Sequence, residues 1–171
     1  MKRKKETEQQ LIFAIIFIRC ICSRNVHPIL DHALEVARAA ALPYAGSVRP
    51  RDAWDLVQAG AAVLVDVRSA EERKFVGHVP GVAHVAWASG TSLTRNPRFV
   101  RELEAKVRKD ETVLLLCRSG KRSALAAEAA TKAGFASVFN VLEGFEGELN
   151  DSQQRGTADG WRFRGLPWVQ D

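Results

Sequence analysis

Residues 112–123, with the sequence TVLLLCRSGKRS, decide the predicted fold. The first five residues are apolar or β-branched and predict a buried strand that ends at Leu116. The residues from Ser123 to Lys132 are rich in alanine and predict a helix, with Ser123 as its N-cap. Cys117 therefore lies where a buried strand ends and a helix begins, so its sulfur is expected to face the N-terminus of that helix.

The predicted surroundings of Cys117 favour the thiolate form of its side chain. A helix N-terminus presents unpaired N–H groups and the positive end of the helix dipole. Three cations, Arg118, Lys121 and Arg122, follow within five residues, and Gly120 allows a tight backbone turn. Because the thiolate is the reactive form of cysteine, the stretch predicts a nucleophile rather than an inert buried thiol.

The rest of the chain alternates between apolar strands and amphipathic helices. Strands are predicted at residues 63–67, 82–87 and 138–141, with a short one at Val48. Helices are predicted at residues 31–42 and 51–59, and from Pro97 to Val107. This alternation predicts a single α/β domain with a parallel sheet and helices on both faces. Catalytic residues then belong at the carboxyl ends of strands, which is where Asp66, Arg68 and Cys117 lie.

The loop that begins at Cys117 resembles the active-site loop of the rhodanese family, whose usual form is C-R-x-G-x-R-S. Residues 63–68 (VLVDVR) resemble the apolar strand of that family that ends in D-x-R, and residues 77–82 (GHVPGV) resemble its G-H-I-P-G-A turn. Residues 138–145 (VFNVLEGF) resemble the strand and turn that follow the catalytic helix. The similarity runs from about residue 48 to about residue 168.

The segment before Gly77 departs from the family pattern. In the usual pattern an aromatic residue follows the acidic pair directly, whereas here Arg73 and Lys74 stand between Glu72 and Phe75. The loop before Gly77 is therefore expected to be about one residue longer than usual.

The resemblance implies a sulfurtransferase that moves a sulfane sulfur from thiosulfate or a similar donor to a thiol or cyanide. Cys117 would be the nucleophile and would carry the sulfur as a persulfide. Backbone N–H groups and cations of the following residues would bind the anions: Arg118, Ser119, Gly120, Lys121, Arg122 and Ser123. Asp66 and Arg68 would brace this loop, or Arg68 would face the substrate; the alternative is that the two form an ordinary ion pair at the end of the strand. The resemblance implies no metal and no organic cofactor, and the expected partners are a small-molecule donor and acceptor.

Two alternatives to a sulfurtransferase are open from the sequence. Cysteine phosphatases and arsenate reductases also bind an anion after a buried strand, but with the spacing C-x5-R, whereas Cys117 and Arg122 give C-x4-R. The shorter loop predicts a smaller cradle, suited to one sulfur atom rather than a tetrahedral phosphate. The other alternative is a non-enzymatic sulfur-carrier or docking module, whose typical mark, loss of the cysteine, is absent here.

Residues 1–26 differ in composition from the rest of the chain. They carry six basic and two acidic residues, so that residues 27–171 contribute only +1 to the net charge of +5. Because that body is nearly neutral and has no nucleic-acid motif, nucleic acid is not expected as a partner. The apolar run at residues 11–18 is shorter than the roughly 20 residues that span a bilayer. We expect a cytoplasmic protein, with membrane association or export through this run as the alternative.

The expected organisation has four parts. Residues 1–26 form an extension that is anchor-like, signal-like or non-native, and residues 27–46 form an N-terminal helix. Residues 47–149 form the catalytic domain, and residues 150–171 form a loop and a tryptophan-containing tail that packs on it. Neither the spacing of Cys20 and Cys22 nor that of the histidines predicts a zinc site.

Overall fold

The computed structural model describes residues 27–90 and 92–170, so the predictions for residues 1–26 lie outside the described residues. The helices are α2 (Pro28–Ala39), α3 (Pro50–Gln58), α4 (Ala70–Val76), α5 (Phe99–Glu104) and α6 (Lys121–Lys132). The strands are β1 (Gly46–Val48), β2 (Val63–Asp66), β3 (Ala83–His84), β4 (Ala88–Ser89), β5 (Thr94–Arg95), β6 (Thr112–Leu116) and β7 (Ser137–Val141).

A five-stranded sheet with the order β1-β7-β6-β2-β3 forms the centre of the fold, and all of its strand pairs are parallel. Strand β6 is the middle strand, with Leu116 opposite Asp66 of β2 and Leu115 opposite Asn140 of β7. The carboxyl ends of β2, β6 and β7 therefore meet at one edge of the sheet. The predicted α/β fold with a parallel sheet is confirmed.

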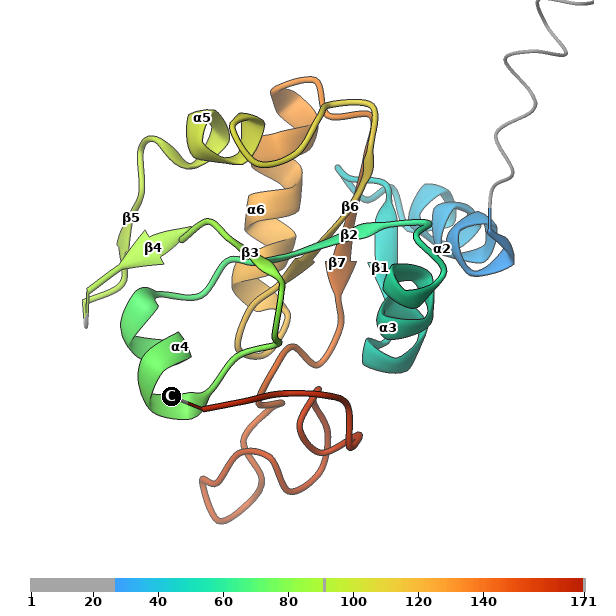
Figure 1. The fold of residues 1–171 in the computed structure, drawn as a ribbon. Coiled ribbons are helices and arrows are strands. Elements are labelled where there is room, and N and C mark those ends of the chain that lie inside the picture. The colour runs from blue at the N-terminus through green and yellow to red at the C-terminus, as the bar shows by residue number, and fades with distance from the viewer. Residues whose placement is uncertain (1–26, 91, 171) are drawn as a thin grey trace, which may run out of the picture.

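The sheet is buried on both faces, which is why β6 is a continuous apolar run. Val113 and Leu115 face the core formed with α5 and α6, whereas Leu114 and Leu116 face the core formed with α2 and α3. Figure 1 shows α2 and α3 together on one side of the sheet and α6 on the other. Cys117 continues the alternation and lies in the α6 core.

The segment before Gly77, which was expected to be a loop about one residue longer than usual, contains helix α4. Ser69 and Glu72 make a capping box, in which each side chain accepts a hydrogen bond from the backbone N–H of the other. The spacing Ser-x-x-Glu was present in the sequence as a signal for a helix start. Arg73 and Lys74, which stand between Glu72 and Phe75, are therefore part of a helix, and Phe75 itself is 69% exposed.

Other predicted elements differ in extent, including the helix predicted at residues 31–42, which is Pro28–Ala39. The N-cap of α6 is Gly120, not Ser123, because Gly120 adopts a positive φ of 87° that turns the loop into the helix. Helix α5 ends at Glu104, although Val107 in the following turn is still buried against the core. The predicted strand at residues 82–87 pairs regularly only at Ala83–His84, and the hairpin of β4 and β5 follows it.

The C-terminal segment packs on the carboxyl edge of the sheet and against the end of α4 (Figure 1). Trp161 is fully buried, and its indole N–H donates to the Pro167 carbonyl at 2.9 Å. Val169 and His78 exchange backbone hydrogen bonds of 2.8 and 2.9 Å. Across residues 27–90 and 92–170, none of the helices has the length and apolar character that crossing a membrane requires.

Candidate active site

The Cys117 sulfur lies in a cradle made by the loop between β6 and α6. The Gly120 N–H donates to Sγ at 3.2 Å, and the Ser123 hydroxyl oxygen lies 3.1 Å from the same sulfur. Cys117 is only 1% exposed. A backbone N–H and a hydroxyl aimed at a buried sulfur favour a negative charge on that sulfur.

The turn after β7 holds the loop in place from behind. The Phe145 N–H donates to the Cys117 carbonyl at 2.8 Å, and the Glu146 N–H donates to the Arg118 carbonyl at 2.9 Å. Gly144 lies so close that a β-carbon added to it would be 2.5 Å from the Arg118 carbonyl and the Ser119 nitrogen. Only glycine permits this approach, so the turn fixes the first residues of the loop.

The three loop cations lie in different surroundings. Arg122 makes a two-pronged ion pair with Glu72 of α4, with N–O distances of 2.6 and 2.7 Å. Lys121 points outward, is 78% exposed at its side chain and pairs with Glu148. Arg118 has its Nε buried without a hydrogen-bond partner among the described residues. Of the three cations predicted to bind the anion, Lys121 and Arg122 are therefore already paired with carboxylates.

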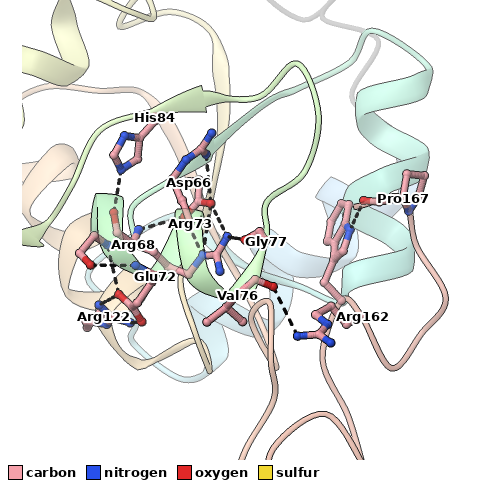
Figure 2. Close-up of polar contacts among 12 residues, drawn as sticks. Asp66, Arg68, Glu72, Arg73, Val76, Gly77, His84, Arg122, Arg162 and Pro167 are labelled. Atoms are coloured by element: carbon pink, nitrogen blue, oxygen red, sulfur yellow. Dashed lines mark hydrogen bonds and ion pairs between the residues drawn. The ribbon is translucent and has the colours of Figure 1, made fainter. Parts of the chain in front are cut away.

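Glu72 connects α4 to the loop. Burial alone raises the pKa of a carboxyl, but the hydrogen bonds from Arg122 and from the Ser69 N–H hold the pKa of Glu72 below its usual value. The same carboxylate caps α4 and pairs with Arg122, so it fixes the helix and the arginine together. Figure 2 shows the contacts between Glu72 and Arg122.

Replacing Glu72 with Gln is expected to destabilise the protein at neutral pH by about 2 kcal/mol, because Arg122 loses a charged, partly buried partner. The pKa of Glu72 is lowered by folding, so its stabilising contribution is present above the pKa of the unfolded chain. The contribution is lost as pH falls through the folded pKa, and the two proteins should converge in acid. Urea unfolding of both proteins from pH 7 down to about pH 3 measures this. A difference that stays constant over that range contradicts the ionic origin of the effect.

Asp66 and Arg68 form a fully buried ion pair beneath the loop. Arg68 donates to Asp66 Oδ2 from Nη2 at 2.7 Å and to the Gly77 carbonyl at 2.9 Å, and its guanidinium stacks 3.9 Å from the Phe145 ring. Both side chains have no exposed surface. Figure 2 shows the pair tying the end of β2 to the turn at Gly77. The Arg68 side chain makes no hydrogen bond, ion pair or ring contact with the described residues 118–123, and it reaches the Cys117 loop only through Phe145, whose N–H donates to the Cys117 carbonyl.

A cavity of about 210 Å³ lies next to the loop and is lined by Glu146, Arg155, Gly156, Arg162 and Trp168. Burial raises the pKa of Glu146, although Arg68 and Arg118 oppose the change. A larger cavity of about 570 Å³ lies between α2, β1 and α3, and none of the predicted site residues lines it. In the part of the chain that the structure describes, no cluster of three or more His, Cys, Asp or Glu side chains could hold a metal ion.

Sequence reasoning did not identify two residues of this site. Glu72 pairs with Arg122, and Asn140 lies with its Oδ1 2.6 Å from the Ser123 hydroxyl oxygen. The capping-box spacing of Ser69 and Glu72 predicts a helix start, but it does not predict that Glu72 pairs with Arg122. Asn140 could have been found from the sequence, because it is a polar residue within the mostly apolar strand β7, and a buried amide needs a hydrogen-bond partner.

Comparison with known proteins places the chain among relatives. The family model described as "Rhodanese-like domain" matches residues 49–150. The crystal structure of Rv0390 from M. tuberculosis has 44% sequence identity and a TM-score of 0.68, and the match covers 75% of this chain and 99% of that one. The uncharacterized protein RP600 of Rickettsia prowazekii is 36% identical over 63% of this chain and 82% of its own length. The thiosulfate sulfurtransferase GlpE of Actinobacillus pleuropneumoniae is 28% identical over 70% of this chain and 89% of its own length. The chain belongs to the rhodanese-like domain family.

Proposed function

We propose that the protein is a sulfurtransferase that uses Cys117 to carry sulfur as a persulfide. The observation that carries the proposal is the buried Sγ with two donors, the Gly120 N–H and the Ser123 hydroxyl, within 3.2 Å. Such donors stabilise the thiolate of the nucleophile. The named activity of the GlpE relative, thiosulfate sulfurtransferase, supports thiosulfate as the first donor to test.

The proposed reaction has two displacement steps. The Cys117 thiolate attacks the outer sulfur of thiosulfate, the S–S bond of the donor breaks, and sulfite leaves with the bonding electron pair. Cys117 then carries a persulfide whose negative charge is on the outer sulfur. Cyanide or a thiolate attacks that outer sulfur, the bond to Sγ breaks, and the Cys117 thiolate is restored.

The burial of Cys117 supports a small donor that reaches the sulfur with a single atom. Cys117 is almost entirely buried, so a donor has to present its outer sulfur to the loop while its anionic end stays outside. Lys121 is exposed and attracts anions at the surface, but its pairing with Glu148 reduces the net charge there. Arg122 acts on the loop through its pair with Glu72 rather than as a free anion-binding group.

The decisive test is thiosulfate-to-cyanide transfer, followed as thiocyanate, for the parent protein and for Cys117→Ser. We expect activity in the parent and none above background in the variant, because a serine hydroxyl at this position gives no persulfide. The matched control is the double variant Cys20→Ser/Cys22→Ser, which keeps Cys117 and should keep its activity. A silent parent that cleaves an aryl phosphate instead would replace this proposal with the phosphatase alternative.

A further inference from the structure

The Ser123 hydroxyl has one hydrogen but three acceptors within reach. Its Oγ lies 2.6 Å from Asn140 Oδ1, 3.1 Å from Cys117 Sγ and 3.2 Å from the Gly120 carbonyl oxygen. A hydroxyl donates only one hydrogen bond and accepts with its lone pairs. The three contacts therefore compete, and the state of the sulfur decides which of them is made.

The two oxygen atoms can only accept, whereas the sulfur changes its behaviour with ionisation. A thiol can donate its own hydrogen to the hydroxyl oxygen, and a thiolate can only accept. When the sulfur is neutral, the Ser123 hydroxyl donates its hydrogen bond to Asn140 Oδ1, because this contact of 2.6 Å is the shortest of the three. With a thiolate, the charged acceptor is the stronger one, so the hydroxyl turns toward Cys117.

Asn140 reaches Ser123 because of its place in the sheet. It lies on β7 opposite Leu115 of β6, two residues before Cys117, and is only 4% exposed. Its neighbours Phe139 and Val141 face the opposite core. A carboxamide buried at this position is costly unless it is hydrogen-bonded, and Ser123 is the partner that the structure gives to its oxygen.

We propose that Asn140 is a positioning residue that competes with the Cys117 sulfur for the Ser123 hydroxyl hydrogen. The Ser123 hydroxyl donates to Asn140 Oδ1 while Sγ is an uncharged thiol or the inner sulfur of a persulfide, and it turns to donate to Sγ when the thiolate forms. The thiolate is thus stabilised less than it would be without Asn140, which keeps it reactive toward a sulfane sulfur. This inference rests on the proposed role of Cys117 as the nucleophile.

The test measures how readily Cys117 ionises in two variants of Asn140. Asn140→Leu has nearly the same shape but no acceptor, so Ser123 is free to donate to sulfur at all times. We expect the midpoint of the pH–rate profile for alkylation of Cys117 to move to lower pH than in the parent. Asn140→Asp keeps the shape and strengthens the acceptor, but its carboxylate also repels the thiolate, so both effects move the midpoint to higher pH. The competition for the hydroxyl is the part of that rise that is lost when the Asp substitution is made in a Ser123→Ala background. The readout is the pH dependence of the iodoacetamide reaction rate, taken by mass spectrometry from the peptide with Cys117, because Cys20 and Cys22 also react.

The control is the same Leu substitution in a Ser123→Ala background. Without the hydroxyl, Asn140→Leu should leave the pH midpoint where the Ser123→Ala protein has it. An unchanged or higher midpoint in Asn140→Leu alone overturns the inference, because it means that the amide NH2 group, not the oxygen, faces Ser123. If Asn140→Leu does not fold, a rise in Asn140→Asp that is equally large in the Ser123→Ala background overturns it as well. The titration needs no sulfur donor, so a protein inactive with thiosulfate leaves this test intact.

Discussion

Replacing Asp66 with Asn should lower the free energy of unfolding by about 3–5 kcal/mol. The substitution keeps the shape of the side chain but leaves the guanidinium of Arg68 without a counter-charge where neither side chain is exposed. Arg73 loses its ion pair with the same carboxylate. A buried charge without a partner is among the largest single costs in a folded protein, and it cannot move to solvent from this position.

Urea unfolding of the parent and of Asp66→Asn at neutral pH measures this cost. The matched control is Glu128→Gln, which removes an ion pair with Lys132 on the surface of α6, where the side chains are 33% and 71% exposed. That control should change stability by less than about 0.5 kcal/mol. Equal losses in the two variants would show that burial of the Asp66–Arg68 pair does not matter.

Gly144→Ala should reduce sulfur transfer by about 100-fold, the scale of a misplacement of about 1 Å in a catalytic group. The added methyl group would lie 2.5 Å from the backbone of Arg118 and Ser119, so either the turn or the loop has to move. That backbone comes directly after Cys117 and leads to the Gly120 N–H that points at the sulfur. The displacement therefore acts on the cradle rather than on the general stability of the sheet.

Gly165→Ala separates this steric effect from backbone strain. Gly165 has a φ of +68°, close to the +66° of Gly144, but a methyl group added there meets nothing within 4 Å. Both variants share the cost of a left-handed alanine, about 1–2 kcal/mol, and only Gly144→Ala adds the clash. Thiocyanate formation per folded molecule, with thermal unfolding as the measure of folding, compares them. Similar activity in the two variants would contradict a specific role for the contact behind the loop.

The sequence was sufficient to predict the central strand and its cysteine. Strand β6 was predicted with the bounds that the structure has, because it is buried on both faces and its apolar run is continuous. The edge strand β3 was predicted too long. Only two of its residues pair regularly with β2, but the residues that follow still have apolar side chains in the core, so their pattern is that of a strand. Local pattern thus located the strand ends where Cys117 and Asp66 lie.

Contacts between distant parts of the chain could not be predicted in this way. The partner of Arg122 is Glu72, 50 positions earlier in the chain, and the partner of Ser123 is Asn140, which depends on β7 lying next to β6. No local periodicity specifies which side chain meets another across a sheet. The same limit applied to the loop cations, which looked equivalent in sequence but differ in exposure and pairing.

The order of strands has a consequence for the newly made chain on the ribosome. Strand β6 and Cys117 leave the ribosome before β7 and the turn at residues 144–147, so the thiol exists for a time without Asn140 and without the backbone that closes over it. At a synthesis rate of about 5–20 residues per second, this interval lasts on the order of seconds. During it the cysteine is open to oxidants and to mixed disulfides, and a pause in translation after β6 would extend that exposure.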